Sequence, residues 1–193
     1  MRVAIRSIGY LIRHSSPAKE PCAPEIQIET AVWPLRLPAV EQSVTSFWAE
    51  AFKQPPEVPS ISCAALVETV AEKFVALTRR AGAELANAGG PRDKTLVRHV
   101  YDLHVVRAHY DPAAVVDLAR EIMLADIRAY GHQFPAYRDD PVAETLRAVA
   151  GLAEDERFAQ AYALFLRDMV YGEAPDFKTA LTTISTLAEH LRD

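Results

Sequence analysis

The chain has 193 residues and a mass of 21.4 kDa, the size of one domain or of one domain with a small satellite. Half of the residues are hydrophobic and 24% are charged, which excludes an intrinsically disordered chain, a collagen-like repeat and a coiled-coil rod. The net charge of −5 excludes a generally basic coat for binding nucleic acid.

The cellular compartment is indicated by two features. No apolar run approaches the roughly 20 residues that a membrane span needs, and arginines interrupt the apolar stretch at the start of the chain. The two cysteines, Cys22 and Cys63, allow at most one disulfide, which a chain of this size does not need. We therefore expect a soluble, cytoplasmic protein with no membrane contact.

The first third of the chain predicts short strands. Eight of the thirteen prolines precede residue 60, and proline both breaks helices and favours extended backbone at the residue before it. The expected strands are Arg2–Ile5, Glu25–Val32, Ser43–Trp48 and Val58–Cys63. Three or four short strands of this kind predict part of a mixed sheet.

The rest of the chain predicts about six helices. Apolar residues of 64–86 follow a helical stripe made of Leu66, Val67, Val70, Phe74 and Leu77, and a Gly-Gly-Pro sequence ends this helix. Asp111–Pro112 and Asp140–Pro141 each predict a helix start, with aspartate as the N-cap and proline at the first position. The expected helices span about 64–86, 93–110, 112–131, 141–151, 154–171 and 176–191. The prediction is an α+β fold with a sheet region at 1–63 and a helical region at 64–193.

A basic stretch runs from Lys73 to Arg107, with seven basic and three acidic residues and hence a net charge of +4. Such a stretch in an acidic protein is typical of a phosphate-binding site, and it also arises by chance. On a helical projection Lys73 and Arg80 share one face and border the apolar stripe, whereas Glu68 and Arg79 lie on the far side. At this border the Lys73 ammonium can face a phosphate. The projection alone favours the other arrangement, in which the methylene stem of Lys73 covers the edge of the core and its ammonium is solvated.

The second expected helix contains Arg98, His99 and Asp102. Arg98 and Asp102 have the i,i+4 spacing of an ion pair beside the core face. This pair is either a surface salt bridge or an oriented carboxylate that, next to a histidine, serves acid–base chemistry.

The histidines of this segment do not predict a zinc site. His99, His104 and His109 are spaced by five residues, so each is rotated by about 140° from the last and they cannot converge on one ion. Arg98 and His104 match a loose Arg-x5-His pattern of some helical ribonucleases, but they project about 120° apart.

Two segments together resemble the abortive-infection nucleotidyltransferase toxins of the AbiE/AbiG type. The segment from Glu68 to Arg80, ETVAEKFVALTRR, is similar to the family's E-K-x-x-A-L-x-x-R helix. The segment from Arg98 to Leu103, RHVYDL, is similar to its R-H-x-x-D-L helix. The resemblance implies a polymerase-β-like nucleotidyltransferase with a helical C-terminal part.

The resemblance also implies roles for individual residues. Lys73 is implied to contact the nucleotide phosphates and to act in catalysis with Asp102, the acid near the reacting hydroxyl. Arg80, Arg98 and His99 are implied to assist nucleotide binding. Glu29 resembles the metal-binding acid of the K-x-E motif, although the lysine of that motif is Gln27 here. The implied substrate and cofactor are an NTP and Mg²⁺, and the implied partners are tRNA or another RNA and a cognate antitoxin.

The chain departs from the family at its first motif. A Gly-Ser turn followed by Asp-x-Asp would hold the Mg²⁺, yet the first aspartate of this chain is Asp93. We therefore expect an N-terminally truncated member that is incomplete on its own. The alternative is a non-catalytic helical module that binds nucleotide, RNA or a protein partner, and a helical ribonuclease ranks below both.

Overall fold

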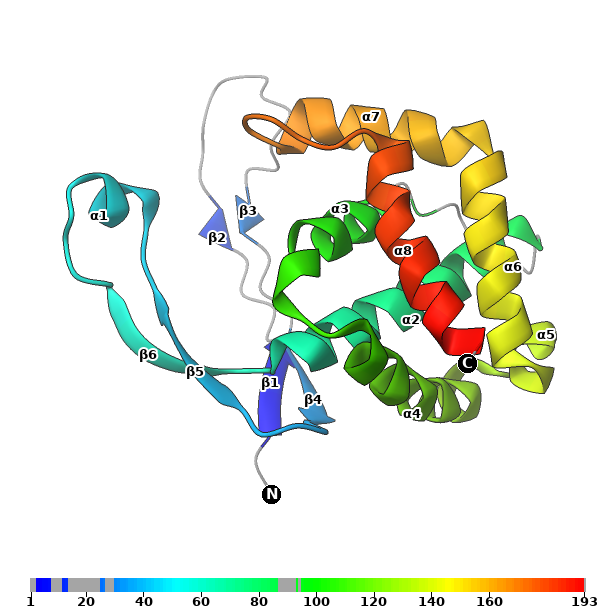
Figure 1. Ribbon diagram of the computed structural model, residues 1–193. Coiled ribbons are helices and arrows are strands. Elements are labelled where there is room, and N and C mark those ends of the chain that lie inside the picture. Colours follow the sequence, from blue (N-terminus) through cyan, green and yellow to red (C-terminus); the bar gives the residue numbers. More distant parts are fainter. Residues whose placement is uncertain are drawn as a thin grey trace. The chain divides into compact units, whose positions relative to one another are not determined.

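The protein is described by a computed structural model that divides into two compact units, Met1–Ala65 and Leu66–Asp193 (Figure 1). The structure describes the backbone of residues 3–7, 12–13, 25–26 and 30–33, and residues 34–86, 93 and 95–192 with their side chains. The first unit contributes the described strands and one short helix, and the second contributes the other helices, so the predicted α+β class is confirmed.

Strands of the first unit form three separate antiparallel pairs. The pairs are β1 (Val3–Ser7) with β4 (Thr30–Pro34), β2 (Ile12–Arg13) with β3 (Glu25–Ile26), and β5 (Val40–Val44) with β6 (Val58–Cys63). The described strands therefore do not form the single mixed sheet that we expected. Each described pair is antiparallel and none pairs with another, so the described residues contain no parallel strand neighbours.

The hairpin of β5 and β6 contains a short helix that the sequence reading missed. Ser43–Trp48 was expected to be a strand, but β5 ends at Val44 and α1 (Phe47–Ala51) begins at residue 47. Ser46 caps this helix, because its hydroxyl accepts a hydrogen bond from the Ala49 amide and donates one to Glu57. Local capping thus overrides the β propensity of the aromatic residues.

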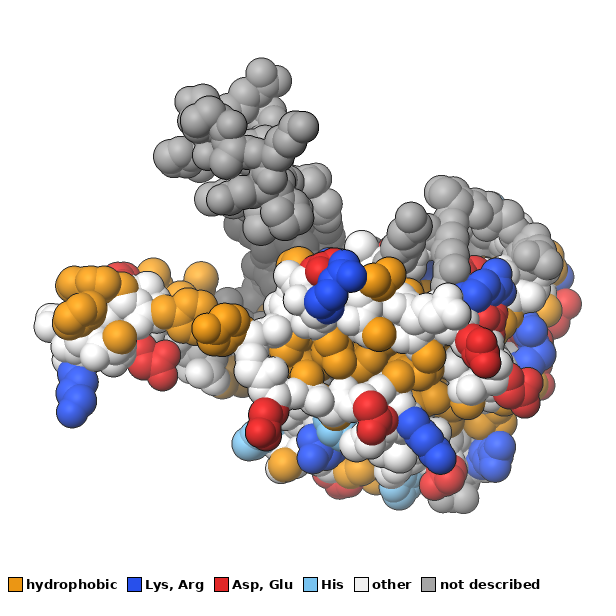
Figure 2. All heavy atoms as spheres, turned by 90° about the horizontal axis from the view of Figure 1, so that it is seen from above, with side chains coloured by type: hydrophobic (Ala, Val, Ile, Leu, Met, Phe, Trp, Pro, Cys, Tyr) orange, Lys and Arg blue, Asp and Glu red, His pale blue; other side chains and the backbone are white. Residues whose placement is uncertain are grey.

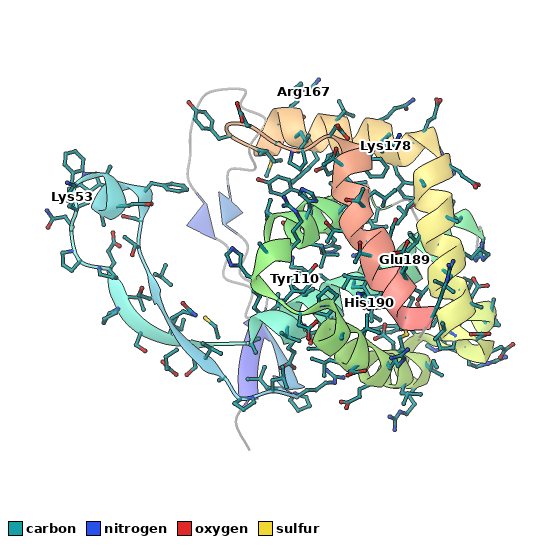
Figure 3. All side chains as sticks on the ribbon, in the orientation of Figure 1. Lys53, Tyr110, Arg167, Lys178, Glu189 and His190 are labelled. Atoms are coloured by element: carbon teal, nitrogen blue, oxygen red, sulfur yellow. The ribbon has the colours of Figure 1, made fainter. Side chains whose placement is uncertain are left out.

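Hydrophobic side chains are exposed along this hairpin (Figure 2). Phe47 is 92% exposed, and the rings of Trp48 and Phe52 lie 5.2 Å apart. Lys53 follows with a positive φ of 52° and projects at the α1 end of the hairpin (Figure 3).

The second unit is a helical bundle. Its helices are α2 (Leu66–Leu85), α3 (Arg98–Val105), η1 (Arg107–His109), α4 (Pro112–Tyr130), α5 (Pro135–Asp139), α6 (Pro141–Glu154), α7 (Glu156–Met169) and α8 (Phe177–Arg192). Both predicted N-caps are confirmed, since Asp111 accepts a hydrogen bond from the amide of Ala113 and Asp140 accepts one from that of Ala143. The expected helix at 93–110 is shorter than predicted and divides into α3 and η1, and α5 was not predicted. No described helix has the length and apolar character needed to cross a membrane.

Helix α2 lies at the centre of the bundle and packs against α3, α4 and α6. Phe74 and Leu77 of the predicted stripe are fully buried, but so are Ala71 and Val75, which lie outside that stripe. Small side chains there let neighbouring helices approach a second face of α2. The helix is therefore buried on more than one face, which is typical of the central helix of a bundle.

Candidate functional site

Two helices of the second unit bring together Lys73 and Asp102. Lys73 lies on α2 and Asp102 on α3, and the Lys73 Nζ atom donates a hydrogen bond of 2.6 Å to Asp102 Oδ2. Their side chains are 33% and 35% exposed, so the pair sits at the rim of the core. One donor hydrogen of the ammonium is engaged, and the group retains two more for a ligand.

His99, one turn before Asp102, completes this contact group. Its Nδ1 atom lies 3.9 Å from Asp102 Oδ2, which is longer than a direct hydrogen bond. Burial opposes ionisation of Asp102, but polar interactions with His99 and Lys73 outweigh it and lower the pKa of Asp102 below its ordinary value. Asp102 is therefore ionised at neutral pH, and it holds the Lys73 ammonium in one position.

Arg80, two turns beyond Lys73 on α2, lies at the N-terminal approach to α3. It forms an ion pair with Asp93, and Asp93 also accepts a hydrogen bond from the Thr95 amide. Burial lowers the pKa of Arg80, and the positive charges of Arg79 and Arg98 lower it further. Arginine remains protonated in spite of this, so Arg80 is a fixed cation that is tied to the start of α3.

Arg98 does not form the expected i,i+4 ion pair with Asp102. Asp102 is paired with Lys73 instead, and Arg98 is exposed and has no ion pair among the described residues. The reason is tertiary, because the α2–α3 packing brings the Lys73 ammonium into contact with the carboxylate. Arg98 is therefore open to solvent, and its charge is near enough to Arg80 to lower the pKa of Arg80.

The structure thus brings Lys73, His99 and Asp102 into one contact group, and the charge of Arg98 acts on Arg80. Glu29 lies outside the described residues. No group of three or more His, Cys, Asp or Glu side chains that could hold a metal ion occurs in the part of the chain that the structure describes. The described residues therefore do not by themselves form a Mg²⁺ site, since Asp102 is a single carboxylate and Lys73 already occupies one of its oxygens.

A further polar group on α2 was missed by the sequence reading. Arg79 was assigned to the solvent side, but its side chain is only 17% exposed. Its Nε donates to Asp126 Oδ2 at 2.8 Å, and its guanidinium carbon lies 4.2 Å from the centre of the Tyr130 ring. Glu68, assigned to the same side, is 1% exposed. No local sequence pattern predicts the burial of Arg79 and Glu68. The partners of Arg79, which are Asp126 and Tyr130, lie on α4.

His104 faces away from this site. It is 6% exposed, and its Nδ1 atom lies 3.0 Å from the Thr183 hydroxyl of α8. Arg98, with which it would form the ribonuclease pattern, is exposed on another side of α3. His104 is therefore part of the packing between α3 and α8.

The buried position of His104 predicts a pH dependence of stability. Burial lowers the pKa of His104, and the charge of Arg107 lowers it further. Below about pH 6.5 the unfolded chain therefore binds a proton that the native imidazole does not, so stability is lost as the pH falls from 7 toward 5. We expect His104→Gln to reduce this loss in urea denaturations at several pH values. The exposed His109→Gln is the control, and an unchanged pH slope in His104→Gln would contradict the prediction.

Comparison with protein families gives one match. Residues 6–183 match the family model described as nucleotidyl transferase AbiEii toxin, type IV TA system. Comparisons with curated proteins and with solved structures give no match. The matched range includes both helices of the Lys73–Asp102 contact and nearly all of the helical unit. The chain therefore belongs to the AbiEii nucleotidyltransferase toxin family of type IV toxin–antitoxin systems.

Proposed function

We propose that Lys73 and His99 bind the phosphates of a nucleoside triphosphate, with Asp102 orienting Lys73 and with Arg80 and Arg98 adding positive charge. The observation that carries this proposal is the 2.6 Å contact between Lys73 and Asp102, which joins the two motif helices. A lysine ammonium held by a carboxylate is already oriented when a phosphate arrives. The exposed guanidinium of Arg98 supplies a second charge without first breaking an ion pair.

The reaction proposed for this site is the transfer of a nucleotide to tRNA or another RNA in the cytoplasm: an RNA hydroxyl bonds to the α-phosphorus of the NTP, the bond between the α- and β-phosphates breaks, and pyrophosphate leaves. Asp102 is ionised at neutral pH and is suited to accept the proton of an attacking hydroxyl. Phosphoryl transfer also depends on metal charge, and Mg²⁺ would enter bound to the triphosphate. Because no aspartate precedes Asp93, we propose that this chain binds NTP but does not transfer nucleotide alone. Membership in a toxin–antitoxin family also implies a cognate antitoxin.

Nucleotide binding is the first test. We expect the wild-type chain to bind NTP weakly, and Lys73→Ala to weaken binding by about tenfold or more, because it removes a charged hydrogen-bond donor. Binding should also fall as salt is raised, since exposed charges are screened. Isothermal titration at two salt concentrations measures both effects. Lys178→Ala, an exposed lysine of α8 (Figure 3), is the matched control and should bind as the wild type does.

A transfer assay separates the catalytic proposal from the alternative of a binding module. The chain is incubated with labelled NTPs, Mg²⁺ and total tRNA, and label on the RNA is measured. NTP binding without transfer is the expected result. Label that disappears in Asp102→Ala would show that the chain is active by itself. Absence of NTP binding in the wild type would contradict the proposed function altogether.

A further inference from the structure

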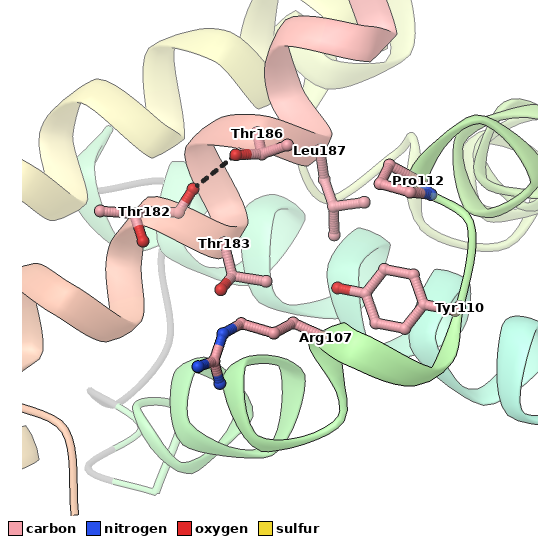
Figure 4. Close-up of a pocket in the computed structure, with 7 residues that line it drawn as sticks. All are labelled: Arg107, Tyr110, Pro112, Thr182, Thr183, Thr186 and Leu187. Carbon is pink, nitrogen blue, oxygen red and sulfur yellow. Dashed lines mark hydrogen bonds between the residues drawn. The ribbon is translucent and has the colours of Figure 1, made fainter.

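A pocket lies in the second unit where η1 and the start of α4 meet α8. Its volume is about 240 Å³. It is lined by Arg107, Tyr110, Pro112, Thr182, Thr183, Thr186 and Leu187. Arg107 and Tyr110 come from the segment that joins α3 to α4, and the threonines and Leu187 come from α8 (Figure 4). None of the seven lining residues is acidic, and Lys73, His99 and Asp102 are not among them.

Arg107 gives the pocket a fixed positive charge. Its Nη1 atom donates to the backbone oxygen of His104 at 2.8 Å, which anchors the guanidinium. No carboxylate pairs with Arg107 among the described residues, whereas Arg79, Arg80, Arg120, Arg138, Arg147, Arg157 and Arg167 each have an acidic partner. An arginine has five N–H donors, so the anchored group keeps donors for an anion.

Tyr110 adds an unused donor beside this charge. Its hydroxyl oxygen is buried and has no hydrogen-bond partner in the described part of the chain. In Figure 4 the hydroxyl points toward α8 between Thr183 and Leu187. Burial raises the pKa of Tyr110, so the phenol stays protonated and can donate. A buried polar group without a partner is unfavourable, and a ligand oxygen would relieve that cost.

The threonines of α8 present acceptors. Thr182 donates its hydroxyl hydrogen to the backbone oxygen of Thr179, and Thr186 donates to that of Thr182. Each hydroxyl oxygen therefore retains lone pairs that can accept a hydrogen bond from a ligand. Pro112 and Leu187 provide short apolar walls.

We propose that this pocket is a second ligand site, which binds a small hydroxylated organic anion. The anionic group meets Arg107 and the Tyr110 hydroxyl, and the hydroxyl groups of the ligand donate to Thr182 and Thr186. A single arginine and a volume of about 240 Å³ suit one anionic group on a short polyol. The pocket is smaller than the roughly 300 Å³ at which sites for drug-sized ligands begin.

The site is tested by titrating the full ¹⁵N-labelled chain with glycerol 3-phosphate and following amide and Arg107 side-chain signals by NMR. We expect shifts at Arg107, Tyr110 and Thr183. Arg107→Gln should weaken binding by about tenfold or more and Tyr110→Phe by about threefold or more. Arg128→Gln is the matched control, because Arg128 is also exposed and also donates to a backbone oxygen, that of Leu124, but does not line the pocket.

Further probes identify which part of the ligand is recognised. Glycerate in place of glycerol 3-phosphate distinguishes a carboxylate from a phosphate as the anionic group. Glycerol, which lacks the charge, and inorganic phosphate, which lacks the polyol, should both bind more weakly than glycerol 3-phosphate. Equal binding of inorganic phosphate would overturn the role of the threonines, and unchanged binding in both Arg107→Gln and Tyr110→Phe would overturn the site. Lys73→Ala should leave this binding unchanged, which keeps the test independent of the proposed nucleotide site.

Discussion

Replacement of Phe74 by alanine is expected to lower the free energy of unfolding by about 3–5 kcal/mol. Phe74 is 0% exposed and lies on α2, the helix that packs against α3, α4 and α6. Truncation removes buried apolar surface and leaves a cavity in the core of the bundle. The loss is a large fraction of the roughly 5–15 kcal/mol that stabilises a typical domain.

Urea denaturation followed by the helical circular dichroism signal measures this effect. Leu124→Ala is the control, since Leu124 lies on α4 but is 59% exposed and should change stability little. If Phe74→Ala does not fold, Phe74→Leu gives a smaller loss of the same sign that can be measured. Equal stability losses in Phe74→Ala and Leu124→Ala would contradict the assignment of α2 as the central helix.

Replacement of Asp126 by alanine is expected to cost about 2–4 kcal/mol, because it leaves the Arg79 guanidinium without its partner. The two side chains are only 17% and 15% exposed, and their contact is 2.8 Å. Contact with the Tyr130 ring covers the guanidinium further. An arginine cannot lose its proton to escape this environment, so the cost falls on the folded state.

An equivalent substitution on the same helix gives a matched control. Asp117 pairs with Arg120 at 3.5 Å, but its side chain is 81% exposed, so Asp117→Ala should cost less than a third as much as Asp126→Ala. Thermal and urea unfolding of both variants provide the comparison. Similar losses would show that Arg79 and Asp126 are no more important than a surface pair. The double variant Arg79→Met with Asp126→Ala should recover part of the loss, because it removes the unpaired charge.

Most of the helical unit could be predicted because its signals are local. The Asp-Pro starts of α4 and α6 satisfy the first free amides of each helix within a few residues, and the observed caps confirm them. The strand region was predicted less well. Aromatic and β-branched residues predicted a strand through Trp48, but the Ser46 cap and its hydrogen bonds with Glu57 start α1 there.

The candidate site could be predicted as a set of residues but not as a set of contacts. Helical spacing placed Arg98 and Asp102 together, yet the partner of Asp102 is Lys73, 29 residues earlier in the chain. The pocket around Arg107 had one signal that was overlooked. Thr179, Thr182, Thr183 and Thr186 follow i, i+3, i+4 and i+7 spacing on α8, although threonine is a weak helix former.

The sequence by itself determined where most helices of this protein begin and which residue types border the core of α2 and α3. Helix starts and helix faces depend on interactions within about four residues along the chain, so N-cap residues and helical periodicity predict them. Only the tertiary structure decided that Lys73 would hold Asp102, that Arg79 would be buried against α4, and that Tyr110 would lack a hydrogen-bond partner among the described residues. The first two depend on how α2 packs against α3 and α4, and the third on how the segment between η1 and α4 meets α8, so none of them depends on neighbours along the chain.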